Sequence, residues 1–390
     1  MKRKTPMPVR NRLAEMQEDI AAWRRDIHAH PELLYDTHRT AALVAAKLQE
    51  FGCDEVTTGI GRTGVVGVIR GRQNTSGRTV GLRADMDALP ILGATGAAHA
   101  STVAGKMHAC GHDGHTAMLL GAAKYLCETR AFRGKVILVF QPAEETIGGG
   151  RLMVEDGIFD RHGVEEVFAL HTDPFAELGV FRTNPGSLMA AVDDYALTVR
   201  GKGGHAAYPH ECRDPMPCAV AIAQALQALP RSIDPLDSVV VALTQFHGGT
   251  APNVIPDAVT LGGTVRSLTP AVRDRVEQRI AEIVAGAAAM HGVEAELDYR
   301  RNYPPTVNHP EQTGFAVEVA REVSGKVVDD MPPEMGAEDF SYMLEARPGS
   351  FLFLGQGLGP SVHHPEFDFN DDAAVIGASF FARLVERRHA

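Results

Sequence analysis

The densest group of chemically reactive side chains lies at residues 107–115, which hold three histidines, one cysteine and one aspartate. Thiolate, imidazole and carboxylate groups are the side chains that bind transition metals in proteins. A helix-favouring apolar run at residues 116–125 follows, so we expect the group to form a loop that leads into a helix. Within this group, Cys110 and His112 are separated by one glycine, and both are candidate metal ligands.

A closed metal site needs further ligands from elsewhere in the chain. Glu144 and Glu145 follow a strand-like run at residues 136–140 and a proline, so their side chains are expected to point in different directions. One glutamate can then bind a metal while its neighbour, in a dry pocket, acts as a general base and afterwards as a general acid. Three histidines elsewhere in the chain could complete the site: His171, His363 and His364.

Two aspartates, Asp85 and Asp87, stand at the end of a strand-like run at residues 79–84. In isolation the pair indicates a solvated turn closed by Pro90. Beside a metal site, however, a carboxylate commonly supports a ligand imidazole through a hydrogen bond. We interpret Asp87 as this supporting residue.

Three glycine-rich segments have less specific patterns. Residues 201–210 contain His205 and residues 248–256 contain Asn253, and the glycines allow close backbone approach to a ligand. A glycine-rich hairpin with incidental polar residues is the alternative for both. The GxGxxG pattern at residues 59–64 precedes a strand-like run instead of following one, so it predicts a plain turn and not a dinucleotide site.

Composition restricts the class of protein. A chain of 390 residues with 44% hydrophobic and 22% charged residues is typical of a globular protein with two domains. The net charge of −11, spread along the chain, argues against a nucleic-acid or anionic-membrane partner. No segment has the pattern of a signal peptide or a membrane span. Five irregularly spaced cysteines argue against a disulfide framework and favour the cytoplasm.

The order of the predicted elements indicates two architectures. Alternating helices and strands up to residue 186 predict an α/β domain on a buried sheet. Two helices and about four strands then predict a compact α+β domain. The rest of the chain is rich in site-like residues, so we expect it to return to the first domain. The predicted domains are therefore residues 1–186 with 302–390, and an inserted domain of residues 187–301.

Taken together, these segments resemble the dinuclear-metal amidohydrolases, the family of hippurate hydrolases, aminoacylases and carboxypeptidase G. The resemblance extends from residues 30–33 to residues 368–371, and it is closest to the branch of N-acyl-amino-acid amidohydrolases. It rests on motifs that occur in the same order: RADMDALP, MHACGHDGHTAMLLGAA, FQPAEE, GGHAAYPH, GTAPNVIPD, GAEDFSYM and HHPEFDFND.

The resemblance implies a site for two divalent metal ions per subunit, with zinc, manganese, cobalt and nickel as candidates. The implied ligands are Cys110, His112, Glu145, His171 and His363, with His364 as the competitor for the last place. Glu144 would be the catalytic base. Glu338 and Asp339, in the GAEDF motif, would line the site.

The resemblance also implies a fold: a metal-binding α/β catalytic domain with an inserted α+β lid that commonly forms a dimer interface. His205 and Asn253 resemble lid residues that reach the substrate, where His205 would stabilise the oxyanion. We therefore expect a homodimer or a higher homo-oligomer.

The predicted function is metal-dependent hydrolysis of the amide bond of N-acyl amino acids, such as hippurate-like substrates, to a carboxylic acid and a free amino acid. The partner would be a small molecule. One alternative is a metallo-dipeptidase or aminopeptidase that uses the same metals. Another is a binding protein that retains the fold without catalysis, although such a protein has no use for a base such as Glu144.

Overall fold

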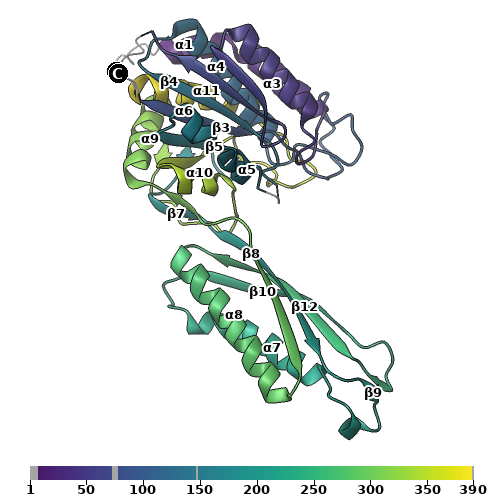
Figure 1. Ribbon diagram of the computed structural model, residues 1–390. Coiled ribbons are helices and arrows are strands. Elements are labelled where there is room, and N and C mark those ends of the chain that lie inside the picture. Colours follow the sequence, from purple (N-terminus) through teal and green to yellow (C-terminus); the bar gives the residue numbers. More distant parts are fainter. Residues whose placement is uncertain (1–7, 73–77, 146–147, 389–390) are drawn as a thin grey trace. The chain divides into compact units, whose positions relative to one another are not determined.

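A computed structural model describes residues 8–72, 78–145 and 148–388 of the chain (Figure 1). The chain forms two compact units. The first contains residues 1–186, 307–332 and 339–390, and the second contains residues 187–306 and 333–338. This architecture confirms the predicted fold class, an α/β domain with an inserted α+β domain.

The first unit is built on an eight-stranded mixed sheet with the strand order β1-β2-β4-β3-β5-β16-β6-β15. Its four central strands, β4, β3, β5 and β16, are parallel to one another. The strands are β1 (Glu55–Ile60), β2 (Gly64–Arg70), β3 (Thr79–Asp85), β4 (Lys135–Gln141), β5 (Glu166–Asp173), β6 (Phe181–Arg182), β15 (Val327–Val328) and β16 (Gly349–Gly355).

Helices cover the sheet of this unit. Helix α4 packs on β3 and is surrounded by α2, α3 and α11, whereas α5 and α10 pack on each other and on β4 and β16 respectively. Every residue of β3 and β16 is buried, as expected for parallel strands covered on both faces. The helices are α1 (Pro8–Glu15), α2 (Gln17–Ala29), α3 (His38–Phe51), α4 (His112–Thr129), α5 (Gly149–Glu155), α6 (Ile158–His162), α9 (Pro310–Val323), α10 (Phe340–Ala346) and α11 (Asp371–Arg388).

The second unit has a four-stranded antiparallel sheet with the order β10-β12-β8-β13. Helices α7 and α8 pack on each other and on this sheet, and their apolar faces form a separate core with it. The elements are β8 (Ala191–Arg200), β9 (Gly204–His205), α7 (Met216–Ala228), β10 (Val239–Gly248), β11 (Val254–Ile255), β12 (Ala258–Ser267), α8 (Pro270–His291) and β13 (Glu294–Arg301). Two short strands, β7 (Gly186–Met189) and β14 (Thr306–Asn308), lie where the chain changes unit.

Parallel strands bring distant segments to one edge of the first sheet. Asp85 at the end of β3 is paired in register with Gln141 at the end of β4, and β5 continues beside β3 to His171. Because these strands all run in one direction, their carboxyl ends meet, and ligands bind at such edges in open α/β sheets. The candidate residues of three sequence motifs therefore lie close together.

Three details of the sequence interpretation are settled by the elements. Residues 59–64 cover the end of β1, a turn at residues 61–63 and the start of antiparallel strand β2, so the plain turn is confirmed. Helix α4 begins at His112, so His112 and His115 belong to its first turn, whereas a loop had been predicted there. His171, which ends an apolar run in the sequence, lies inside β5. Within the described residues, no helix combines the length and apolar content needed to cross a membrane.

Candidate metal centre

Cys110 and His112 approach the edge of the sheet from the start of helix α4. Gly111 between them has φ 88°, a left-handed conformation that glycine adopts without strain. A Cβ atom at this position would lie 2.6 Å from Cγ2 of Thr172. The glycine therefore serves two purposes, since it turns the chain between the two candidate ligands and permits contact with β5.

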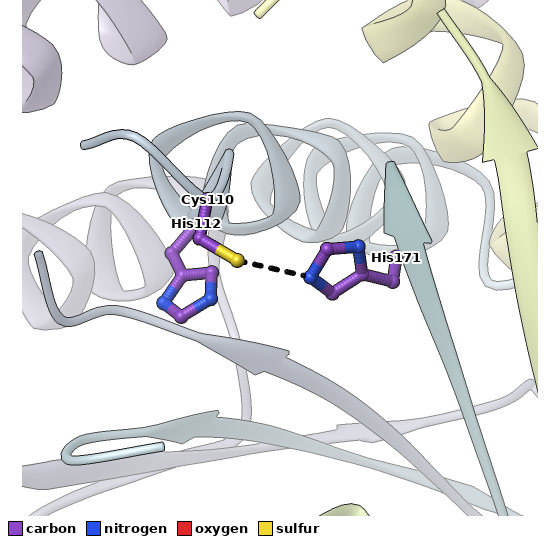
Figure 2. Close-up of side chains that lie close together, drawn as sticks. All are labelled: Cys110, His112 and His171. Carbon is purple, nitrogen blue, oxygen red and sulfur yellow. Dashed lines mark hydrogen bonds between the residues drawn. The ribbon is translucent and has the colours of Figure 1, made fainter. Parts of the chain in front are cut away.

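The candidate ligands form overlapping groups of three residues. Within each group, the ligand atoms lie within 4.8 Å of one another. Figure 2 shows one group, in which Sγ of Cys110 lies 3.3 Å from Nε2 of His171 with His112 alongside. The groups relevant to the predicted ligands are Cys110–His112–His171, Cys110–Glu145–His363 and His112–Glu144–Glu145. Because Cys110 and His112 each belong to more than one group, the cluster is larger than a single tetrahedral site needs.

Backbone carbonyls determine which nitrogen of each imidazole faces the cluster. Nδ1 of His112 donates to the carbonyl of Asp87 at 2.8 Å, and Nδ1 of His171 donates to the carbonyl of Thr172 at 2.7 Å. A carbonyl oxygen only accepts, so Nδ1 carries the proton in both rings. Each Nε2 therefore faces the cluster and can present a lone pair there once it is deprotonated, the arrangement that outer hydrogen bonds impose on metal-binding histidines.

Glu145 and His363, which are far apart in the sequence, lie together in the cluster. Nε2 of His363 lies 3.3 Å from Oε1 of Glu145. The backbone N–H of His363 donates to the carbonyl of Ala109 at 2.7 Å, which ties this loop to the cysteine segment. His364 instead accepts the N–H of Glu366 through Nδ1, at 3.1 Å, so the geometry favours His363 as the C-terminal ligand.

Asp87 is buried and holds the two glutamates through their backbone. Its carboxylate oxygens accept the N–H of Glu144 at 2.9 Å and that of Glu145 at 3.1 Å. The carboxylate lies 3.5 Å from Nδ1 of His112, whereas the carbonyl of Asp87 takes the shorter hydrogen bond. Asp87 thus supports the imidazole mainly through its main chain and uses its side chain to orient the loop after β4.

A second set of hydrogen bonds reaches His171 indirectly. Arg83 donates to Oδ2 of Asp85 at 2.8 Å, and Oδ1 of Asp85 accepts from Nδ1 of His115 at 2.7 Å. Nε2 of His115 then accepts the N–H of Thr172 at 2.9 Å, beside His171. Both nitrogens of His115 are thereby used, so His115 acts as a neutral structural support and not as a ligand.

The electrostatics of the cluster favour anionic sulfur. Burial and the nearby Glu145 carboxylate oppose ionisation of Cys110, but the positive imidazole rings of His171 and His112 prevail and lower the pKa of the thiol to about 6. Contacts with Cys110 and with Glu145 raise the pKa of His363 to about 10. In the absence of a cation, these groups compensate one another as thiolate, carboxylate and imidazolium.

Two buried atoms show that the cluster suits a cation. Nε2 of His112 is buried without a hydrogen-bond partner among the described residues, and Oε1 of Glu145 is buried with the 3.3 Å ion pair to His363 as its contact. An unsatisfied buried polar atom costs on the order of 1–3 kcal/mol, so such atoms are normally paired or coordinate an ion. The donor set of sulfur, nitrogen and oxygen is also the set that binds zinc and related divalent metals.

His205 and Asn253 lie together in the second unit. His205 on β9 pairs with Val254 on β11, and the N–H of Ala206 donates to the carbonyl of Asn253 at 3.0 Å. Both side chains are exposed. Nδ1 of His205 accepts the N–H of Ala207 at 3.1 Å, which leaves its Nε2–H as a donor to solvent or to a ligand.

The sequence singles out Asp85 and Asp339 without indicating the contacts that they make, and it indicates no role for Arg83 or His115. The three-residue spacing of His112 and His115 could have placed both on one face of a helix. Nothing in the sequence links Asp339 to residue 83, yet its carboxylate accepts from Arg83 at 2.9 Å and from Gln141 at 2.8 Å. These contacts arise only when the strands are assembled.

Comparisons with known proteins identify the family. The chain matches the family described as peptidase family M20/M25/M40 over residues 81–387. It is 40% identical to the hippurate hydrolase of Campylobacter jejuni, covering 95% of this chain and 97% of that protein. It is equally 40% identical to thermostable carboxypeptidase 2 of Saccharolobus solfataricus, covering 96% and 97%.

A solved structure supports the same family assignment. A dinuclear metal binding peptidase of the M20 family from Bacillus subtilis superimposes with a TM-score of 0.86 at 32% identity, covering 96% of this chain and 99% of that one. The chain therefore belongs to peptidase family M20/M25/M40 and is a hydrolase of that family. The resemblance to dinuclear-metal amidohydrolases found in the sequence is confirmed.

The lowered pKa of Cys110 predicts unusual reactivity in metal-free protein. Thiolate is the nucleophile, so alkylation by iodoacetamide should accelerate as pH rises and level off above a midpoint of about 6. Mass spectrometry of the tryptic peptide 107–124 measures this rate. In the variant His171→Ala the loss of a positive ring should move the midpoint upward. An unchanged midpoint in that variant would show that His171 does not stabilise the thiolate.

Proposed function

We propose that this protein hydrolyses the amide bond of N-acyl amino acids and releases a carboxylic acid and a free amino acid. The observation that carries the proposal is the placement of Glu144, buried next to the candidate ligands, with its carboxylate within 4.0 Å of Nε2 of His112. The 40% identity to a hippurate hydrolase over nearly the whole chain supports the substrate class.

The proposed cofactors are two divalent ions, with zinc, manganese, cobalt or nickel as candidates. The residues that would hold them are Cys110, His112, Glu145, His171 and His363. When bound, such metals lower the pKa of water and polarise a carbonyl group. The overlap of ligand groups around Cys110 and His112 supports two ions instead of one.

The protein's own groups then move the proton. The carboxylate of Glu144 accepts a proton from the attacking water and then donates it to the leaving nitrogen, so one residue acts as base and then as acid. Asp87 keeps Glu144 in place through the backbone N–H at 2.9 Å. His205 is proposed to donate through Nε2 to the developing oxyanion, with Asn253 beside it as a substrate contact.

Replacing the base should separate catalysis from metal binding. Glu144→Gln is expected to keep its full metal content and to lose on the order of 10²–10⁴ in kcat, because the amide cannot accept the proton. Cys110→Ala is expected to lose metal, whereas Cys212→Ala, a cysteine of the second unit, should lose neither metal nor activity. Metal content is measured by plasma mass spectrometry. Full activity in Glu144→Gln would refute its role as base.

A peptidase that uses the same site is the second candidate function, since a carboxypeptidase is as similar in sequence as the hippurate hydrolase. Initial rates on benzoyl-glycine and on a dipeptide with a free amine separate the two. We expect a higher kcat/KM for benzoyl-glycine and loss of turnover with a chelator. Preference for the free amine would indicate a dipeptidase or aminopeptidase, and no turnover with any metal would indicate a binding protein.

We also propose a homodimer formed through the second unit. Edge strand β10 has no acidic or basic residue except His247, and its Val240 and Phe246 are 40% exposed. Helix α7, which packs on β10, also exposes Val220. The opposite edge strand, β13, is rich in charged residues, which natural sheets use to prevent pairing. Sedimentation velocity should give a dimer for the wild type and a monomer for Val240→Lys. A monomeric wild type would contradict the proposal.

A cytoplasmic location is proposed from the free cysteines.

A further inference from the structure

Two cysteines of the first unit that play no part in the candidate metal centre lie in contact. Cys53 is in the loop between α3 and β1, and Cys127 is in the last turn of α4. Their Sγ atoms are 3.6 Å apart, although the residues are 74 positions apart in the chain. Cys127 is buried at the edge of the core, and Cys53 is half-buried beside it.

The segments that carry the two cysteines are joined by Arg130, the residue that ends helix α4. Its guanidinium donates to the carbonyl of Gly52 and to Oδ2 of Asp54, both at 2.7 Å, on either side of Cys53. It also donates to the carbonyl of Arg70 at 2.8 Å. These hydrogen bonds flank Cys53 and start from the residue three positions after Cys127, so they hold the two cysteine segments together.

We propose that Cys53 and Cys127 are a modification site: a dithiol that a hydroperoxide, such as hydrogen peroxide, oxidises to an intramolecular disulfide. A disulfide has an S–S length near 2.05 Å, so the sulfurs must approach by about 1.5 Å. Rotation of the two side chains can provide this movement without breaking the hydrogen bonds of Arg130. The proposal does not depend on the proposed hydrolase function.

The reaction balances with one peroxide molecule. The sulfur of Cys127 attacks a peroxide oxygen, the O–O bond breaks, and the leaving hydroxide takes the thiol proton and departs as water. The sulfur of Cys53 then attacks the resulting sulfenic acid, the S–O bond breaks, and the hydroxyl leaves with the proton of Cys53 as a second water. The two sulfurs lose two electrons in total, and the peroxide gains them.

The charges around the pair support this order of events. The hydrogen bond from the thiol of Cys53 lowers the pKa of Cys127. Burial opposes this change, and the positive charge of Arg130 adds to it, so the pKa of Cys127 is lowered overall. The same hydrogen bond raises the pKa of Cys53. Cys127 is therefore the sulfur that more readily becomes a thiolate, the form that reacts with peroxide, and Cys53 is the thiol that resolves it.

The experiment treats metal-loaded protein with a small excess of hydrogen peroxide and digests it with trypsin under non-reducing conditions. Peptides 48–62 and 125–130 should appear as one cross-linked species that dithiothreitol separates. In Cys53→Ser this species should vanish, and dimedone should label Cys127 instead. Cys212→Ser, which removes another half-buried cysteine, should leave the cross-link unchanged.

Thermal unfolding provides an independent measurement. A bridge across 74 residues restricts the unfolded chain, so the oxidised wild type should have a Tm about 5 °C above that of the reduced protein. The double variant with serine at both positions should show no such difference. Separate, unlinked peptides after oxidation, or a link between Cys53 or Cys127 and any other cysteine, would overturn the proposal.

Discussion

The first unit depends on the compensation of many ionisable groups buried around one point. A carboxylate or thiolate removed from water is costly unless hydrogen bonds or opposite charges replace its hydration. Asp87 receives two backbone N–H groups, and Asp85 receives Arg83 and His115. After these pairings, Nε2 of His112 is left without a hydrogen-bond partner among the described residues, and Oε1 of Glu145 has the ion pair with His363. Both atoms belong to the candidate ligand groups, so the buried charges of this unit are concentrated where a cation would be compensated.

The parallel sheet makes this arrangement rigid. Motifs at the ends of β3 and β4 and within β5 are held in register by the strand ladders, so their side chains meet with little freedom. Helix α4, almost entirely buried, adds His112 and His115 from its first turn. Ligands mounted on strands and a packed helix keep their geometry better than ligands on loops do. Three candidate ligands, Cys110, Glu145 and His363, lie outside helices and strands, and the backbone hydrogen bond of His363 to Ala109 joins two of their segments.

The second unit follows a different physical logic. Its sheet is antiparallel with two helices packed on it, so the sheet can expose polar residues to water on its other face. His205 lies on β9, which pairs with β11, and Asn253 directly precedes β11 and accepts the N–H of Ala206, so both backbones are held while the side chains are exposed. Such a placement suits residues that contact a ligand which enters and leaves. The same unit also carries the apolar edge strand β10.

Helix and strand patterns and side-chain chemistry are local properties, so the fold class, the periodic elements and the types of candidate ligand could be predicted from the sequence. The apolar run that predicts α4 begins only at residue 116, because no local pattern indicates that the left-handed Gly111, beside Thr172, starts the helix at His112. Which nitrogen of His112 faces the cluster depends on the carbonyl of Asp87, a contact that forms only in the folded chain. The same holds for the contacts of Arg83 with Asp339 and of Cys53 with Cys127. Contacts between positions so far apart arise from the assembly of strands and helices, which no local pattern encodes.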